Sequence, residues 1–165
     1  MTENELERYM RQYYRSVYRT ALCRCKDPQD ADDVAQDVFL KLYTYSGQFS
    51  DDDHVRAWLL RCTINHSIDV LRSRKRRNTV SLDAAANTAH YDDKDKDSSR
   101  VFELFLKLSE KNRTVMYMHY CEGYSVKEIA KITGTKESTV LSRLMRGRNQ
   151  LEKLLKDERS ADNGI

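Results

Sequence analysis

The sequence SVKEIAKITGTKESTVLSRLMRGR, residues 125–148, decides the fold of the carboxy-terminal part of this chain. Ser125 is followed three residues later by Glu128, the pattern of a capping box in which each side chain bonds a free backbone amide of the first helical turn. This pattern predicts a helix that starts directly after Ser125. Gly134 then interrupts the run, and a second amphipathic stretch follows it.

Ala130, Gly134 and Val140 have the spacing of a helix-turn-helix, in which a small residue lets the second helix cross closely and a glycine forms the turn. Val140 and Leu144 mark the apolar face of the second helix. Its other faces carry short hydroxyls and guanidinium groups, which suit base edges and phosphates: Thr139, Ser142, Arg143 and Arg146. We interpret the stretch as DNA-binding. The alternative is one helical hairpin of an all-α core with a basic, solvated face.

The charge of the chain is arranged in patches. Its 165 residues are 39% hydrophobic and 33% charged, with a net charge of only +3. Residues 72–77 and 143–148 are basic, whereas residues 30–37, 51–53 and 92–97 are acidic. Alternating patches of this kind indicate both a nucleic-acid partner and a protein partner.

The sequence gives no sign of a membrane or a cofactor. No apolar run approaches membrane-spanning length, and the amino terminus MTENELERYM is too charged for a signal peptide. We therefore expect a cytoplasmic protein without membrane insertion. No nucleophile with a base and no glycine-rich phosphate loop appears, so we expect no enzyme and no cofactor.

Cysteine and histidine are sparse and poorly spaced for a metal. The cysteines are Cys23, Cys25, Cys62 and Cys121, and they form no CxxC pair. Residues two apart on a helix point to nearly opposite sides, so neither Cys23 with Cys25 nor His119 with Cys121 could hold one ion. We expect half-buried thiols, and a metal or redox-sensing site is the alternative.

The amino-terminal part reads as helices. The chain has one proline and no alternating β-branched runs, which predicts an all-α class. Apolar residues recur at three and four from Leu6 to Ala21, the pattern of a long tyrosine-rich helix. Asp27 and Pro28 are typical of an N-cap and the first position of a second helix. That helix has an apolar stripe of Val34, Val38, Phe39 and Leu42, and a polar face of Asp32, Asp33, Gln36 and Asp37.

A polar loop, residues 45–53, leads into a third helix predicted at about 54–72. Its core stripe is Ala57, Leu60, Ile64, Ile68 and Leu71, and its opposite rows hold Trp58, Arg61, Asn65 and Arg72. Trp58 beside polar residues indicates a binding surface, and the alternative is that it packs against the first helix. The predicted helix ends in the basic residues 72–77, which include Arg74 and Arg76. We favour phosphate contact there over a solvated helix end.

Residues 78–99 lose all periodicity and end in alternating Asp and Lys, which predicts a flexible linker between two small helical domains. Beyond it, residues 101–108 are amphipathic, and Ser109 is a candidate cap for the helix carrying Val115 and Met116. Gly123 ends that helix. Gly147, inside the last helix, is expected to cost about 1 kcal/mol relative to alanine.

Three segments together resemble a bacterial sigma factor: residues 30–43 (DADDVAQDVFLKLY), 55–77 (VRAWLLRCTINHSIDVLRSRKRR) and 108–148. The size and the two-block layout are similar to the extracytoplasmic-function type, which has only sigma regions two and four. The resemblance covers residues 13–155. It implies a region-two domain at 1–77, a linker at 78–99, a region-four domain at 100–158 and a tail at 159–165.

The resemblance also implies roles. Core RNA polymerase would bind the positions of Asp33, Gln36 and Asp37, and an anti-sigma factor would be a further partner. Promoter DNA would be melted at the minus-ten element by the helix of Trp58, Arg61, Asn65, Arg72, Arg74 and Arg76, with Asn65 at a base-reading position. The acidic linker would pass into the polymerase cleft. The positions matching those that meet the minus-thirty-five element are Lys136, Ser138, Thr139, Leu141, Ser142 and Arg146. From the chemistry and spacing of the helix itself we add Arg143 and Arg148, and expect Arg146 to read bases and Arg148 to hold phosphate.

Departures from the family pattern lie in the helix-turn-helix. Thr133 and Thr135 replace larger apolar residues of the turn, which predicts looser packing there. Leu141 stands where Lys or Arg is frequent, so one DNA contact is missing. The alternative function is a stand-alone helix-turn-helix regulator, which would dimerise on a two-fold site. No heptad seam or spare apolar helix for a dimer is visible.

Overall fold

The computed structural model describes residues 1–77 and 96–163. Within these ranges the chain forms seven helices and no strand. The chain divides into two compact units, Met1–Tyr91 and Asp92–Ile165. These observations confirm the prediction of an all-α protein with two small helical domains. Residues 78–95, which make up most of the predicted linker, lie outside the described residues.

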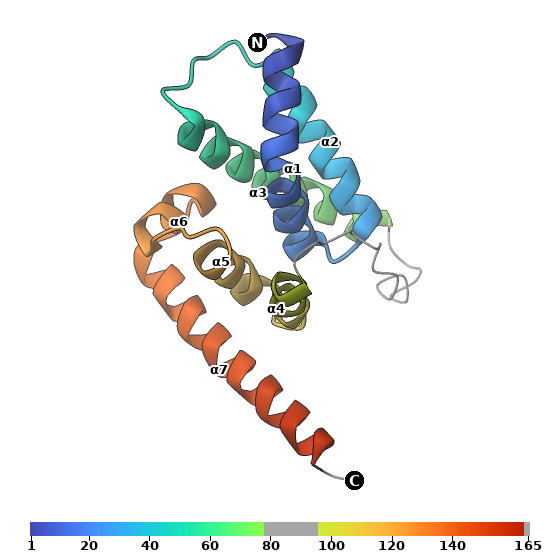
Figure 1. Cartoon of the computed structure of the whole chain (residues 1–165), viewed down its shortest axis with the longest axis vertical. Coiled ribbons are helices and arrows are strands. Elements are labelled where there is room, and N and C mark those ends of the chain that lie inside the picture. Colours follow the sequence, from blue (N-terminus) through green and yellow to red (C-terminus); the bar gives the residue numbers. More distant parts are fainter. Residues whose placement is uncertain (78–95, 164–165) are drawn as a thin grey trace. The chain divides into compact units, whose positions relative to one another are not determined.

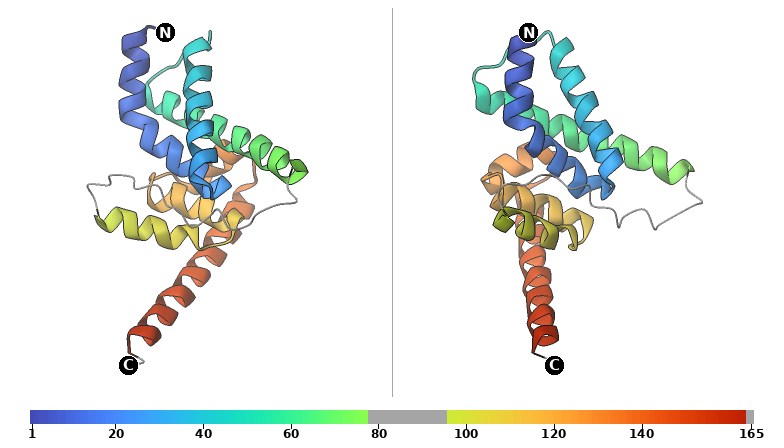
Figure 2. Two further views of the ribbon diagram at one scale, coloured as in Figure 1. Left: turned by 90° about the vertical axis from the view of Figure 1, so that its right-hand side faces the viewer. Right: turned by 45° about the vertical axis from the view of Figure 1, so that its right-hand side comes forward.

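The first unit is a three-helix bundle of α1 (Glu3–Cys25), α2 (Pro28–Thr44) and α3 (Asp52–Arg77). Figures 1 and 2 show α1 and α2 side by side and running in opposite directions, with α3 crossing both. Lys26 ends α1 in the left-handed conformation, and its amide donates to the carbonyl of Leu22. The Asp27 side chain then accepts from the amide of Asp30 and caps α2, with Pro28 at the first turn as predicted.

The apolar stripe predicted for α2 is buried in full, and α1 contributes Val17 and Ala21 to the same core. The stripe predicted for α3 is correct only in its middle, since Leu60 and Ile64 are buried whereas Ala57, Ile68 and Leu71 are half-buried. Val55 and Leu59 join the core instead. The buried sector is wider than one stripe because α3 packs against both α1 and α2.

Helix α3 is longer than the predicted 54–72 at both ends. Asp52, in its first turn, bonds three side chains of α1: it accepts from Arg8 at 2.9 Å and 3.3 Å and from the Tyr9 hydroxyl at 3.3 Å, while its carbonyl accepts from Tyr13. The hydrogen bond from Arg8 lowers the pKa of the Asp52 carboxyl. At the other end, the basic run predicted to terminate the helix is itself helical through Arg77.

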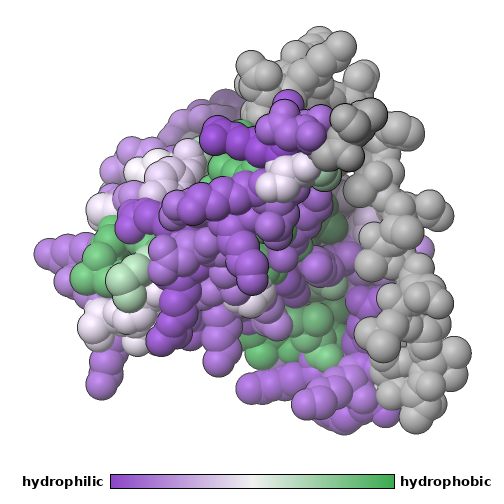
Figure 3. Space-filling model, turned by 90° about the horizontal axis from the view of Figure 1, so that it is seen from below, coloured by the Kyte–Doolittle hydropathy of each residue, from purple (hydrophilic) through white to green (hydrophobic). Residues whose placement is uncertain are grey.

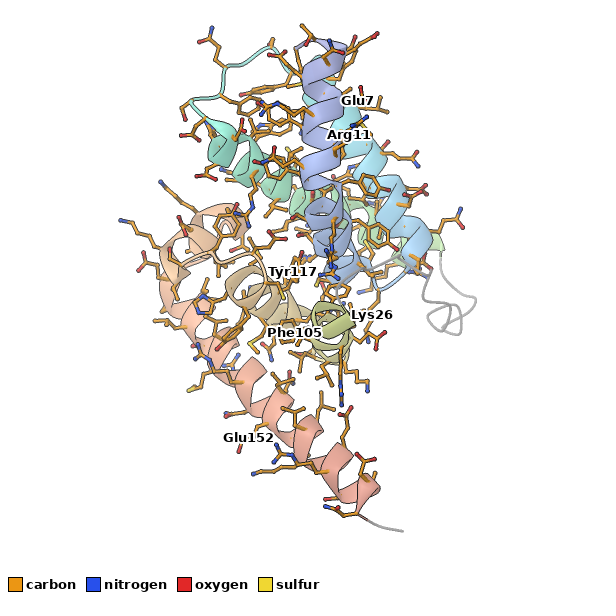
Figure 4. The ribbon with its side chains drawn as sticks, viewed as in Figure 1. Glu7, Arg11, Lys26, Phe105, Tyr117 and Glu152 are labelled. Carbon is orange, nitrogen blue, oxygen red and sulfur yellow. The ribbon has the colours of Figure 1, made fainter. Side chains whose placement is uncertain are left out.

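The second unit contains α4 (Lys96–Leu106), α5 (Glu110–Tyr120), α6 (Val126–Thr133) and α7 (Glu137–Asp162). Phe105 of α4 and Tyr117 of α5 are buried in its interior (Figure 4). Helix α4 begins at Lys96, five residues before the amphipathic stretch predicted at 101–108, and α7 continues to Asp162. The last turns of α7 extend past the other helices of this unit (Figure 2), and Glu152 lies on that part (Figure 4).

The helix-turn-helix is confirmed, with α6 and α7 as its two helices. Ser125 and Glu128 form both bonds of the capping box. Gly134 ends α6 with φ 67°, a left-handed conformation that is strained for a residue with a side chain. Its amide donates to the carbonyl of Ala130. In the turn, the hydroxyls of Thr133 and Thr135 lie 2.9 Å apart and share a hydrogen bond, which replaces the apolar packing that the residue types lack.

Two expectations about the second unit need correction. Ser109 occupies the N-cap position of α5 but makes no side-chain cap bond. Its amide and hydroxyl instead donate to Gln150 of α7, which also accepts from Asn112 at 3.1 Å. Gly147 is buried, and a Cβ atom there would lie 2.6 Å from Cγ of Met116 on α5. The close α5–α7 crossing therefore favours glycine at this position despite its low helix propensity.

Candidate nucleic-acid and partner surfaces

The first candidate surface is the acidic face of α2, formed by Asp33, Gln36 and Asp37. All three side chains are exposed, as the sequence predicted. They lie three and four residues apart on one side of the helix. The Gln36 amide donates to Asp32 at 3.0 Å, and the Asp37 carboxylate lies 2.9 Å from Nε2 of His66 on α3. The contact with His66 holds the Asp37 carboxylate against α3.

The acidic face continues into two exposed residues with large apolar side chains, Leu40 and Tyr43. Leu40, which follows Asp37 by three positions, is 62% exposed, and Tyr43 is 41% exposed. Both belong to a helix whose buried stripe is already complete without them. The available signal was their spacing, since Leu40 lies four positions after Gln36 and Tyr43 three positions after Leu40. Exposed apolar residues that adjoin a charged face in this way are typical of a partner surface.

The second candidate surface is a row along the outer side of α3. Six residues share this side, since each is three or four positions from the next: Trp58, Arg61, Asn65, Asp69, Arg72 and Arg76. From Trp58 to Arg76 the row is about 27 Å long at 1.5 Å per residue. Arg61, Asn65 and Arg72 are exposed, and within the described residues none of them has an ion-pair or hydrogen-bond partner. Asp69 is the single acidic member.

An aromatic cluster stands at the amino-terminal end of this row. Trp58 is half-buried, with its ring 4.9 Å from that of Tyr45 and 5.7 Å from that of Phe49, measured between centroids. Phe49 in turn meets the ring of His54 at 5.2 Å. The ring partners of Trp58 therefore come from the loop before α3, whereas the alternative weighed from the sequence was packing against the first helix. The loop that looked merely polar supplies two of the aromatic side chains.

Arg74 differs from the other cations of the basic run. It lies on the opposite side of α3 from the row, where its guanidinium pairs with Asp30 at 3.2 Å and with Asp27 at 3.3 Å. Asp27 is also the cap of α2, so this arginine ties the end of α3 to the start of α2. A DNA contact by Arg74 would compete with these two ion pairs.

The third candidate surface is the reading face of α7, the outward side of its first three turns. Val140 and Leu144 are buried against the rest of the unit, as predicted. Lys136, Ser138 and Arg146 are exposed, while Thr139, Ser142 and Arg143 are half-exposed. The Ser142 hydroxyl donates to the carbonyl of Ser138, which leaves its lone pairs available. Among the described residues neither Arg143 nor Arg146 has a carboxylate partner.

Arg148 is held within the second unit. Its Nε donates to the Tyr120 hydroxyl, and its guanidinium carbon lies 5.7 Å from the centre of the Tyr120 ring. The phosphate contact predicted for Arg148 would therefore start from a guanidinium already fixed by an exposed tyrosine. Two apolar residues of α7 are strongly exposed beside it, Leu141 at 56% and Met145 at 58%. The sigma-factor resemblance indicated the position of Leu141, whereas no sequence pattern indicated Met145.

The described ranges add no sign of a metal site. No cluster of three or more His, Cys, Asp or Glu side chains with the arrangement of a metal site occurs in residues 1–77 and 96–163. Cys23 and Cys25 are both buried, against the expectation of half-buried thiols, and burial raises the pKa of Cys25 to about 11. In the same ranges no helix is long and apolar enough to cross a lipid bilayer.

Comparison with known proteins shows the family of the chain. Residues 9–77 match the Sigma-70 region 2 family model, and residues 99–151 match that of Sigma-70, region 4. The ECF RNA polymerase sigma factor SigM of Mycobacterium tuberculosis is 30% identical over 149 residues, which cover 90% of this chain and 76% of SigM. SigW of Bacillus subtilis is 27% identical over 160 residues, covering 88% of this chain and 86% of SigW.

Solved structures agree on the fold. The sigma factor RpoE of Bartonella quintana, in complex with the anti-sigma factor NepR, superposes with a TM-score of 0.72 at 23% identity, covering 92% of this chain and 97% of that chain. CnrH, in complex with the cytosolic domain of CnrY, gives a TM-score of 0.64 at 23% identity, with 94% and 90% covered. The chain thus belongs to the ECF RNA polymerase sigma factors, which are DNA-binding transcription initiation factors and not enzymes.

Proposed function

We propose a residue-level division of labour for this sigma factor. The acidic face of α2 binds core RNA polymerase, the row on α3 contacts the minus-ten element, and the reading face of α7 contacts the minus-thirty-five element. The observation that carries the proposal is that α3 and α7 each present cations and polar groups outward, free of carboxylate partners among the described residues. In a fold with 26 acidic residues such free cations are available for phosphates.

Polymerase binding through α2 follows from charge and from Leu40. Carboxylates that meet basic side chains of a partner form charge-assisted hydrogen bonds, and these are stronger when an apolar neighbour excludes water. Asp33, Asp37 and the exposed Leu40 form such a combination on one side of the helix. His66 holds the Asp37 carboxylate in place and is a positioning residue for this contact.

Strand opening by α3 follows from the aromatic cluster and the row behind it. Unpaired bases stack on aromatic rings with about 1 to 3 kcal/mol per base, and cations along the same side can follow the backbone. Trp58 offers a half-buried ring at the start of the row, and Asn65 offers an amide that can both donate to and accept from a base edge. Capturing an unstacked base shifts the melting equilibrium without ATP.

The remaining assignments concern place and partners. Residues 1–77 would form the polymerase and minus-ten domain, residues 100–158 the minus-thirty-five domain, and residues 78–99 the connection between them. The site of action is the bacterial cytoplasm, where RNA polymerase and promoter DNA meet. An anti-sigma factor is a further partner, by analogy with the complexes that RpoE and CnrH form.

Reconstitution with core RNA polymerase tests the polymerase surface. The full chain should direct initiation from defined starts on genomic DNA, and Asp37→Lys should weaken its co-purification with core polymerase. Glu7→Lys is the matched control, because it reverses an exposed charge on α1 of the same unit. Equal binding by both variants would remove α2 from the interface while leaving the sigma activity itself intact.

Asn65 is tested on promoter opening. Asn65→Ala leaves no cavity because the side chain is exposed, so thermal stability should stay unchanged while discrimination at the minus-ten element falls. A heteroduplex promoter with that element already unpaired separates the two roles of the residue. If the variant recovers full discrimination there, Asn65 acts in melting and not in base reading.

A further inference from the structure

The reading face of α7 contains an apolar pair that the fold does not use. Leu141 and Met145 are four residues apart, and their exposed fractions, 56% and 58%, are among the largest of the apolar side chains in the described residues. The packing of this helix is supplied by their immediate neighbours Val140 and Leu144, which are 0% and 1% exposed. The pair is therefore directed at something outside the unit.

Helix geometry places the pair among polar groups that suit DNA. Each residue advances by about 100° around the axis, so Leu141 and Met145 lie one step from the buried row and border the outward line of Ser138 and Ser142. Arg143 and Arg146 occupy the other border. The pair is consequently one edge of a surface whose remainder is hydroxyls and guanidinium groups.

Thymine is the DNA component that such a pair can recognise. In the major groove each base pair shows its own pattern, and the C5-methyl group of thymine is the apolar element of that pattern. Leucine has no hydrogen-bonding group and methionine has only a weakly accepting thioether, yet both side chains can exclude water from a methyl group. We propose that Leu141 and Met145 are specificity-determining residues that contact thymine methyl groups of the minus-thirty-five element.

The proposal rests on the proposed function of α7, and the size of the pair favours DNA over a protein partner. A specific protein interface buries roughly 800 Å² on each side, far more than two side chains supply. Figure 3 shows that apolar residues on the face drawn there gather only in small patches among hydrophilic ones. Arg143 and Arg146, on the other border of this surface, suit the phosphates that flank a major groove.

The spacing limits which bases are read. Four residues of α-helix advance about 6 Å, and successive base pairs are about 3.4 Å apart. Leu141 and Met145 therefore face base pairs no more than two steps apart. Because the methyl group lies in the major groove whichever strand carries the thymine, the prediction is for two A·T or T·A pairs at adjacent or next-adjacent positions.

Replacing thymine by uracil tests the contact one methyl group at a time. The promoter is selected from a random pool by the holoenzyme, and each thymine of its minus-thirty-five element, on either strand, is changed singly to uracil. One buried methyl contributes about 0.8 kcal/mol, so affinity should fall roughly fourfold at one or two positions and stay unchanged elsewhere. The proteins are the wild type, Leu141→Gln, Met145→Gln and the control Leu155→Gln.

The variants make the test specific. Gln matches Met in length, keeps the helix propensity and removes the apolar contact. Leu141→Gln and Met145→Gln should both fold normally, because the two positions are exposed. For each variant, replacing thymine by uracil should no longer lower the affinity at one position. Leu155 is a 37% exposed leucine further along α7, and Leu155→Gln should keep the full penalty.

Several results would overturn the assignment. Indifference of the wild type to uracil at every position, or an element without A·T pairs, would exclude methyl reading. An unchanged uracil penalty in both Gln variants, with weaker holoenzyme assembly, would make the pair a protein-binding surface instead. A holoenzyme that ignores replacement of the entire minus-thirty-five element would refute the proposed function of α7, and that result is distinct from the others.

Discussion

Gly147→Ala should destabilise the second unit, although helix propensity alone predicts the reverse. In an exposed helix the change would contribute about 1 kcal/mol of stability, because glycine is the more flexible residue in the unfolded chain. Here a Cβ atom would lie 2.6 Å from Cγ and 2.9 Å from Sδ of Met116, distances at which something must move. Met116 has no exposed surface into which it could swing.

The magnitude follows from two opposed contributions. Overpacking a close-packed core by one methyl group costs about 1 to 3 kcal/mol. Subtracting the gain of about 1 kcal/mol from propensity leaves a net destabilisation of up to about 2 kcal/mol. For a unit of this size, a change of about 1 kcal/mol corresponds to about 4 to 8 °C in the melting temperature.

The chain provides its own internal control for the assay. Its single tryptophan, Trp58, lies in the first unit, so tryptophan fluorescence during urea unfolding of the full chain reports that unit. Native-state hydrogen exchange of the α5 and α7 amides reports the second unit. Gly147→Ala should lower protection in α5 and α7 and leave the tryptophan midpoint unchanged.

A second substitution, Met116→Ala, provides a background in which the close contact with Gly147 is absent. Met116→Ala should cost about 2 to 5 kcal/mol by itself, because it empties a fully buried site. In that background the methyl group added by Gly147→Ala meets a cavity, so the same substitution should become stabilising. Asn149→Ala, at an exposed position of the same helix, shows the propensity gain without a packing change. If Gly147→Ala stabilised the wild type as much as Asn149→Ala does, the reasoning from the close contact would be refuted.

Three further predictions concern side chains with other roles. Arg74→Ala should lower the free energy of unfolding by about 1 kcal/mol, because it removes the ion pairs with Asp27 and Asp30. Arg72 is exposed, so Arg72→Ala should leave stability unchanged and weaken DNA binding. Denaturation and promoter binding are measured on both variants. Under native conditions maleimide should modify exposed Cys121 well before Cys25. Because burial raises the folded pKa of Cys25 to about 11, its neutral thiol favours the fold up to about pH 9 and that contribution is lost towards pH 11; Cys25→Ala should flatten this part of the stability profile.

Much of the fold could be predicted from local sequence patterns. Asp27 with Pro28, the Ser125 and Glu128 box, and Gly134 each act within one turn of backbone, so the residue types alone locate the helix ends. The apolar stripe of α2 was equally readable, because one side of that helix faces the core. Local chemistry and tertiary structure agree at these positions.

The features missed from the sequence depend on contacts between distant segments. Gly147 looks like a defect until Met116, 31 positions earlier, is placed against it. Arg74 looks like its basic neighbours until Asp27 and Asp30 are brought to its guanidinium. The Trp58 partners Tyr45 and Phe49 come from a loop whose composition gives no periodic signal. Sequence periodicity predicts on which side of a helix a residue lies. Which distant residue packs against that side becomes known only from the tertiary structure.

The close contact at Gly147 also bears on the DNA contact proposed for α7. Val140, Leu144 and Gly147 are the buried residues of the helix, and all three lie within its first three turns. The glycine lets α7 approach α5 more closely than any other residue would, and the approach distance sets the direction of the helix axis. The proposed base-reading residues Leu141, Met145 and Arg146 lie on the same segment. Their positions therefore depend on a residue on the packed side of the helix. A reading site held within a fraction of an ångström needs such support from the packed side of its own helix.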